Sequence, residues 1–134
     1  MILELVDAGR QVSVVTNKGL ERTLIDLGVA GIPPETFTTI VTAEDTVERK
    51  PHPAPILLGL SRANGKVEDA AYVGDGPQDI LAARAAGMPA IAVTYGFYDR
   101  AILETHAPDV IADSPAALAA ALGVQAASAK GAAE

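Results

Sequence analysis

Cysteine is absent from this sequence of 134 residues, which excludes disulfides and thiolate metal sites. Aromatic residues make up 4% of the chain against 49% hydrophobic residues, so the core must consist of Val, Ile, Leu and Ala. No apolar run approaches the ~18 residues that a membrane-spanning helix needs. The first residues contain Glu4 and Asp7, which a secretory signal would not contain. We therefore expect a cytoplasmic protein that has no membrane partner.

Positive charge is also scarce, because 10 Lys and Arg residues stand against 17 Asp and Glu residues. The formal net charge of −7 argues against nucleic acid as a partner, and an anionic substrate would have to be captured by local groups. The length is sufficient for one hydrophobic core, which we place in residues 1–122. Residues 123–134 are rich in Ala, Ser and Gly, and we expect them to form a disordered tail.

Short apolar runs alternate with amphipathic segments along the whole domain. The expected strands are 11–16, 37–42, 71–74, 90–94 and 110–112. The expected helices are 2–8, 18–27, 54–63, 77–86, 100–106 and 115–122, with Gly28 closing the second. Strands that alternate with helices indicate βαβ units, and the sequence therefore predicts an α/β fold with a doubly wound parallel sheet.

Polar groups follow two of these strands and one intervening loop, in the segments VVTNK, RKPHP and VGDGPQDI. Their functional side chains are Thr16, Asn17, Lys50, Asp75 and Asp79. Because the carboxyl ends of parallel strands form the ligand crevice of an open sheet, we expect these groups to meet at one rim. A hydroxyl, an amide, an ammonium and two carboxylates together suit a phosphate and a Mg²⁺ ion.

Each of these residues also has a plainer interpretation when it is taken alone. Thr16 and Asn17 are good helix N-caps, and Lys50 is of the type found solvated in loops. Asp79 could interact with a helix dipole, and Asp75 could serve a turn. These explanations do not account for two aspartates meeting a glycine at the end of a strand. We interpret His52, in the same loop as Lys50, as a loop residue without a chemical role.

The order of the three segments resembles the haloacid dehalogenase-like (HAD) phosphohydrolases, especially the phosphoglycolate phosphatase-like branch. VVTNK is similar to the second motif of that family, Lys50 to the third, and Asp75 and Asp79 to the fourth. The segment ILAARAAGMPAIAVTYGF is similar to the usual continuation of that branch. The resemblance implies a Rossmannoid HAD-like core that hydrolyses a small phosphorylated metabolite with the help of Mg²⁺.

The resemblance also implies a role for each residue. Thr16 and Asn17 would bind the transferring phosphoryl group. Lys50 would stabilise the charge of that group and of the nucleophile. Of the family's catalytic residues, this sequence would therefore contain Lys50 and Thr16. Asp75 would ligate Mg²⁺, with Asp79 among the ligands of the ion or just behind them.

The family's first motif, a strand ending in DxDxT with the nucleophilic aspartate, has no counterpart here. The acidic residues before Thr16 are Glu4 and Asp7, and both fall in an expected helix. The helical cap that selects the substrate is missing as well. We therefore expect a HAD core that lacks its central first strand and is inactive alone. Strands 11–16 and 71–74 would lose their shared partner, which predicts self-association or a complementing chain.

Three hypotheses stay open for the function. The chain is an N-terminally truncated phosphatase, one half of a split phosphatase, or a non-catalytic phosphate- or nucleotide-binding α/β module. A receiver-like signalling domain fits less well, because its acidic pair should follow the first strand and its lysine the fifth. The identity of the substrate stays open too, since the absent cap would determine it.

Overall fold

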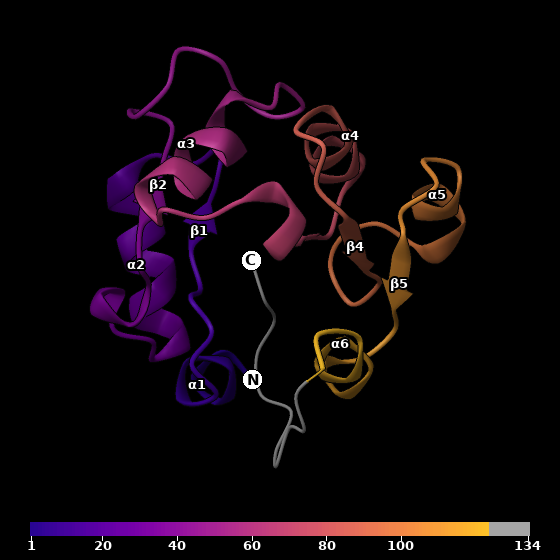
Figure 1. The fold of residues 1–134 in the computed structure, drawn as a ribbon, viewed down its shortest axis with the longest axis horizontal. Helices are drawn as coiled ribbons and strands as arrows, with labels where there is room; N and C mark the ends of the chain where they lie inside the picture. The colour runs from indigo at the N-terminus through magenta and orange to yellow at the C-terminus, as the bar shows by residue number, and fades with distance from the viewer. Residues whose placement is uncertain (124–134) are drawn as a thin grey trace.

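The computed structural model describes residues 1–123, in which short strands alternate with helices (Figure 1). The strands are β1 Val14–Val15, β2 Ile40–Val41, β3 Tyr72–Gly74, β4 Ala90–Val93 and β5 Val110–Ala112. The helices are α1 Ile2–Asp7, α2 Leu20–Ala30, α3 Ala54–Arg62, α4 Pro77–Ala85, α5 Arg100–Glu104 and α6 Pro115–Ala121. The 3₁₀ helices Pro34–Thr36 and Val67–Asp69 were not expected from the sequence. The expected tail lies outside the described residues, apart from Gly123.

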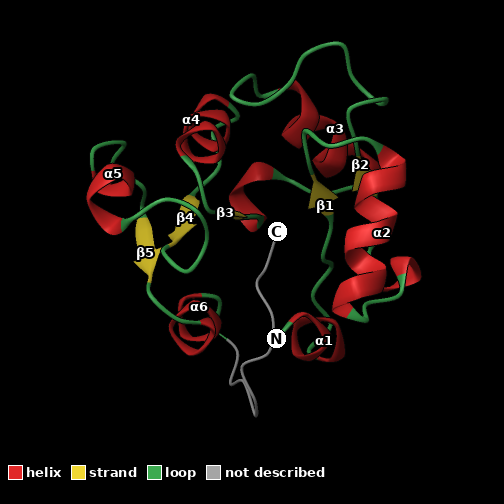
Figure 2. Cartoon of the chain, turned by 180° about the vertical axis from the view of Figure 1, so that it is seen from behind, coloured by secondary structure: helices red, strands yellow, loops and turns green. Residues whose placement is uncertain are grey.

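All strand pairs in the described residues are parallel, but they form two separate sheets. One sheet pairs β1 with β2, and the other has the order β3–β4–β5. Figure 2 shows β1 and β2 set apart from β3, β4 and β5. The expected pairing of VSVVT with TTIVT, and of AAYVG with AIAVT, is confirmed. The described residues place no strand between β1 and β3.

Helices α3, α4 and α5 cover one face of the strands. Their side chains Ile56, Ile80 and Leu103 form a buried cluster with Val15 of β1. The side chains of a strand alternate between its two faces, so the preceding residue, Val14, points to the opposite face. There it packs with Ile2 of α1 and Leu27 of α2.

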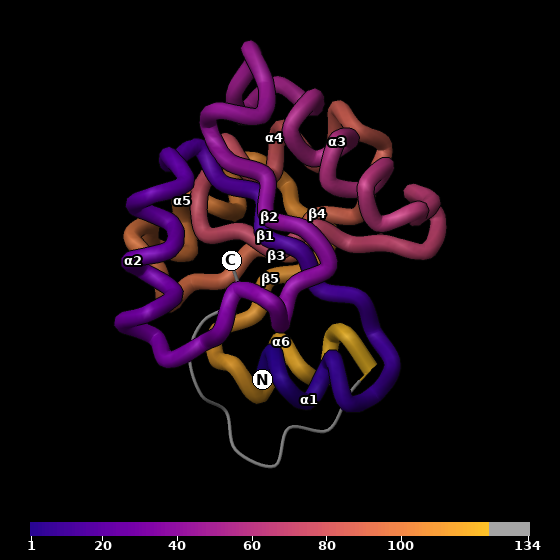
Figure 3. The backbone as a smooth tube through the Cα atoms, turned by 90° about the vertical axis from the view of Figure 1, so that its left-hand side faces the viewer, coloured from indigo at the N-terminus to yellow at the C-terminus, as the bar shows by residue number. Residues whose placement is uncertain are grey.

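The opposite face is covered by α1, α2 and α6. Leu5 of α1 and Leu118 of α6 pack together with Ile91 of β4 in a second buried cluster. Figure 3 shows α1 and α6 beside each other, with α3 and α4 on the far side of the strands. The doubly wound architecture is therefore confirmed. None of the helices in residues 1–123 has the length and apolar character needed to span a bilayer.

The strands are shorter than the apolar runs predicted, most clearly in β1 and β2. The pairing does continue beyond the regular ladder, because Thr38 N–H donates to the carbonyl of Val12 at 2.8 Å. Apolar residues indicate which segment is buried, whereas a regular ladder of hydrogen bonds defines the strand. With only one neighbour each, β1 and β2 keep that regular pairing for two residue pairs.

Helix α2 corrects the expectation that Gly28 closes it. The helix continues through Gly28 and ends at Gly31, which has a φ of +73°. Ile32 N–H then donates to the carbonyl of Leu27 at 3.0 Å, which closes the helix in the manner of a Schellman motif. A left-handed residue is needed for this hydrogen bond, so the conformation decides which glycine is the cap.

We expect Gly31→Ala to lower the free energy of unfolding by about 1 kcal/mol, because alanine is strained in the left-handed region. Gly28→Ala is the matched control, since a Cβ there would meet nothing within 4 Å and the residue is helical. It should leave the stability unchanged or raise it by about 0.5 kcal/mol. Urea denaturation followed by circular dichroism measures both, and equal effects would contradict the assigned helix end.

Candidate active site

The carboxyl ends of β1 and β3 meet at the same edge of the molecule. Thr16 directly follows β1, and Asp75 directly follows β3. The Nζ atom of Lys50 connects the two sides, because it donates to the carbonyl of Val15 at 3.0 Å and to Oδ1 of Asp79 at 2.7 Å. The expected convergence at one rim is therefore confirmed.

Lys50 is buried, which rules out the interpretation as a solvated loop lysine. Its side chain is 9% exposed, and the side chain of its ion-pair partner Asp79 is 7% exposed. Its ammonium also donates to the hydroxyl of Tyr72 at 2.7 Å. Together with the carbonyl of Val15 and the carboxylate of Asp79, this hydroxyl gives each of the three N–H donors a partner.

Asn17 fixes the loop that contains Lys50. Its Nδ2 donates to the carbonyl of Lys50 at 3.1 Å, and its Oδ1 accepts from the Lys50 N–H at 3.0 Å. Thr16 Oγ1 accepts from the N–H of Lys18 at 3.1 Å, so this hydroxyl stabilises the turn after β1. Through these bonds, Asn17 holds the loop of Lys50 against the end of β1.

Neither Thr16 nor Asn17 is the N-cap of α2, so the plainer interpretation of these residues is wrong. The N-cap is Gly19, and the carboxylate of Glu44 accepts from the Leu20 N–H at 3.1 and 3.2 Å. This backbone hydrogen bond holds the pKa of Glu44 below its ordinary value. The N-terminus of α2 thus already faces an anionic side chain from the loop after β2.

The two aspartates after β3 differ in what surrounds their oxygens. Oδ2 of Asp79 accepts from the N–H groups of Asp75 and Gly76 at 3.2 Å each, while Oδ1 accepts from the ammonium of Lys50. Asp75 is exposed, and within residues 1–123 its carboxylate accepts no hydrogen bond. Asp75 is therefore the carboxylate that could ligate an ion, and Asp79 fixes the turn behind it.

A metal ion at Asp75 would depend on ligands from elsewhere. Residues 1–123 contain no group of three or more His, Asp or Glu side chains placed to hold one. His52 is exposed, and its Nδ1 accepts from the Ala54 N–H at 3.0 Å. This contact at the start of α3 agrees with its interpretation as a loop residue.

The sequence analysis missed Tyr72, Gly74 and Gly96, which shape the rim. A Cβ at Gly74 would lie 2.2 Å from Cβ of Asp79, and one at Gly96 would lie 2.4 Å from Oδ2 of Asp75. Gly96 comes soon after β4, so the rule that parallel strands end at one edge could have indicated it. Tyr72 was recognisable as the one polar side chain within the apolar run AAYV.

Comparison with known proteins identifies the family of this chain. A family model described as haloacid dehalogenase-like hydrolase matches residues 1–93. The chain belongs to the haloacid dehalogenase-like hydrolase family. The match spans all three rim segments, from VVTNK to VGDGPQDI.

Two curated relatives show the extent of the similarity. The phosphoglycolate phosphatase of Yersinia pseudotuberculosis serotype I (strain IP32953) is 36% identical over 127 residues, covering 92% of this chain and 53% of that protein. Pyrophosphatase PpaX of Bacillus pumilus (strain SAFR-032) is 34% identical over 119 residues, covering 89% of this chain and 55% of that protein. The chain therefore spans about half the length of these HAD relatives.

Solved structures share the fold. A hydrolase from Pseudomonas syringae superposes with a TM-score of 0.82 at 24% identity, over 91% of this chain and 56% of that one. CbbY from Rhodobacter sphaeroides, solved in complex with phosphate, superposes with a TM-score of 0.72 at 27% identity, over 82% of this chain and 49% of that one. The HAD-like core expected from the sequence is confirmed.

We expect Lys50→Met to lower the free energy of unfolding by about 3 kcal/mol, because it leaves the buried carboxylate of Asp79 without its counter-charge. The control is Lys18→Met, because the Lys18 side chain is 55% exposed in its ion pair with Asp26 and its loss should matter little. The double variant Lys50→Met/Asp79→Asn should regain part of the loss. Equal urea midpoints for the two single variants would contradict the role of Lys50 as a buried charge.

Proposed function

We propose that this chain provides the phosphate- and Mg²⁺-binding part of a phosphomonoester hydrolase similar to phosphoglycolate phosphatase. The main support is the buried Lys50–Asp79 pair beside the exposed carboxylate of Asp75 at the rim, which accepts no hydrogen bond from residues 1–123. The phosphoglycolate phosphatase relative and the phosphate complex of CbbY point to the same chemistry. The substrate would be a small phosphorylated metabolite, and we include a cytoplasmic location in this proposal.

Each rim residue has a distinct task in this proposal. Asp75 would hold the Mg²⁺ ion, which supplies charge neutralisation on the phosphoryl oxygens when it is bound. The hydroxyl of Thr16 would donate a hydrogen bond to one of those oxygens. Lys50 stabilises negative charge at the rim, and Asn17 and Asp79 keep its ammonium in place. Positioning and charge neutralisation of this kind make up most of phosphoryl-transfer catalysis.

The described residues leave no carboxylate to act as a nucleophile at the rim, and the carboxylate of Glu44 there already accepts from the Leu20 N–H and the Thr42 hydroxyl. Before Thr16 the acidic residues are Glu4 and Asp7, both in α1. That helix precedes β1 and lies at the opposite end of the molecule from the loop that joins β2 to α3 (Figure 1). Asp75 and Asp79 are already assigned to the ion and to Lys50. We therefore propose that the 134-residue chain alone does not complete a covalent phosphatase mechanism.

We expect Mg²⁺ to bind weakly to the isolated chain, because one free carboxylate gives few ligands to an ion that prefers six. Titration calorimetry or chemical-shift changes should show this binding, and Asp75→Ala should abolish it. Asp7→Ala removes the same charge from an exposed position on α1 and is the control. Binding that survives Asp75→Ala unchanged would exclude Asp75 as the ligand.

We expect the isolated chain not to hydrolyse an aryl phosphate in the presence of Mg²⁺. Loss of a nucleophile can lower the rate by about 10⁶, as measured in another enzyme. The assay follows release of the phenolate by absorbance. Robust turnover that Asp75→Asn abolishes would show that the chain does contain its nucleophile, and it would overturn the proposed inactivity while supporting the site.

A further inference from the structure

Phe97 is the one aromatic side chain of residues 1–123 that the fold leaves in solvent. It lies in the segment TYGFYD between β4 and α5 and is 88% exposed. The other phenylalanine, Phe37, is 8% exposed in a buried cluster, and the tyrosines are buried or half-buried. Aromatic rings normally contribute to stability through the large area that they bury, and the ring of Phe97 does not.

The loop that contains Phe97 is anchored at both ends. At its start, the hydroxyl of Thr94 donates to Oδ1 of Asp113 at 2.9 Å. At its end, Oδ1 of Asp99 accepts from the Ile102 N–H at 3.3 Å and thereby caps α5. Phe97 therefore projects from a segment whose two ends are tied to the sheet and to a helix.

Tyr98 holds the ring of Phe97 directly. Tyr98 is half-buried and packs against the cluster that contains Ile80 and Leu103. The two ring centroids lie 5.1 Å apart at an interplanar angle of 82°, which is an edge-to-face arrangement. The ring of Phe97 is thus positioned without being buried, and little conformational entropy is lost when a ligand contacts it.

Gly96 brings this ring beside the carboxylate of Asp75. A Cβ at Gly96 would lie 2.4 Å from Oδ2 of Asp75, so the backbone at Gly96 packs directly against that carboxylate. Because consecutive Cα atoms are about 3.8 Å apart, the Cα of Phe97 lies within about 8 Å of Oδ2 of Asp75. Aromatic rings pair at centroid separations of about 4.5–7 Å. The organic group of a phosphate ester bound beside Asp75 is therefore within reach of the ring.

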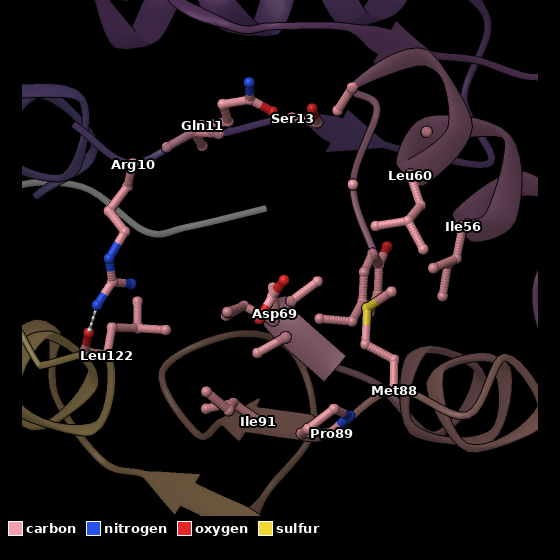
Figure 4. Close-up of a pocket in the computed structure, with 18 of the residues that line it drawn as sticks. Arg10, Gln11, Ser13, Ile56, Leu60, Asp69, Met88, Pro89, Ile91 and Leu122 are labelled. Atoms are coloured by element: carbon pink, nitrogen blue, oxygen red, sulfur yellow. Dashed lines mark hydrogen bonds between the residues drawn. The ribbon is translucent and has the colours of Figure 1, made fainter. Parts of the chain in front are cut away.

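The ring is separate from the cavity of about 810 Å³ that lies between β1 and β3. Figure 4 shows that cavity with Met88 and Pro89, which precede β4, on one of its walls. Phe97 follows β4, and neither Phe97 nor Asp75 lines the cavity. Both residues belong instead to the carboxyl edge of the sheet, where the rim residues lie.

An interface with another protein accounts less well for this exposed ring. Such interfaces use contiguous apolar patches, whereas Phe97 is followed within three residues by Asp99 and Arg100, which are both exposed and charged. A single ring that is fixed next to an exposed carboxylate matches a small ligand with one anionic and one planar part.

We propose that Phe97 is a specificity residue of the rim, whose ring stacks on a planar aromatic group of a phosphomonoester bound at Asp75. This inference rests on the proposed function and narrows its substrate class to aromatic phosphomonoesters. An aliphatic group would gain only the burial of apolar area, whereas a second ring also gains the attraction between two aromatic quadrupoles.

The test measures how tightly the full chain binds inorganic phosphate, cyclohexyl phosphate and phenyl phosphate in the presence of Mg²⁺. Titrations followed by ¹H–¹⁵N chemical shifts give the three Kd values, and nuclear Overhauser contacts between the phenyl protons and the Phe97 ring locate the ligand. Since an aromatic pair adds to the effect of buried area, phenyl phosphate should bind about fivefold more tightly than cyclohexyl phosphate.

Variants of the exposed ring test its role. Phe97→Ala should remove the preference for phenyl phosphate, and Phe97→Leu, which keeps an apolar side chain, should remove it as well. The matched control is Val29→Ala, because Val29 is 85% exposed near the end of α2 that is distant from the rim. This control should keep the preference, and circular dichroism checks that each variant is folded.

Failure of the proposed function gives a different result from failure of this inference. If inorganic phosphate does not bind with Mg²⁺, or if Asp75→Ala leaves the binding of all three ligands unchanged, the proposed function is overturned and this inference with it. If phosphate binds at Asp75 but phenyl phosphate is not preferred, or stays preferred in Phe97→Ala, only the role of Phe97 is overturned. A dimer in light scattering that Phe97→Ala dissociates would overturn it as well, because the ring would then contact a second copy.

Discussion

The ammonium of Lys50 holds the two halves of this structure together at the functional edge. It reaches the backbone of β1 through the Val15 carbonyl and the turn after β3 through the Asp79 carboxylate. Both charged side chains are nearly buried and have lost most of their hydration, so each needs the opposite charge of the other to compensate for that loss. The position of the rim residues relative to one another therefore depends on side-chain contacts, namely this ion pair and the Tyr72 hydroxyl on the Val15 carbonyl, rather than on a continuous sheet.

Several contacts serve mainly to keep that ion pair in place. Asn17 binds both backbone groups of Lys50, and the N–H groups of Asp75 and Gly76 hold the carboxylate of Asp79. Gly74 leaves the space that the side chain of Asp79 occupies. As a result, the carboxylate of Asp75 accepts no hydrogen bond from residues 1–123, whereas the carboxylates of Asp79 and Glu44 are engaged. Because Asp79 offsets part of the positive charge of Lys50 and the net charge of the chain is −7, binding of a phosphate there would benefit strongly from a divalent cation.

The separation of β1 from β3 gives the molecule an unusual inner edge. Parallel sheets are normally continuous and buried, because their backbone groups need partners on both sides. Here apolar helices cover both faces of the space between the strands, yet the sheet is not continuous across it. The same feature explains why β1 and β2 are short and why a side chain, that of Tyr72, reaches across to the carbonyl of Val15.

The sequence by itself determined the order of strands and helices, the pairing of neighbouring strands and the edge at which Thr16, Lys50 and Asp75 meet. These follow from local patterns, namely apolar runs, glycine and proline positions, and the rule that parallel strands end at one edge. Tertiary structure alone decided that Gly31 rather than Gly28 ends α2, that Glu44 accepts from the first N–H of this helix, and that Lys50 is buried with Asp79. The first depends on a backbone angle, the second on a contact between residues 24 positions apart, and the third on the burial of two side chains. Each is set by how distant segments pack, which no local pattern specifies.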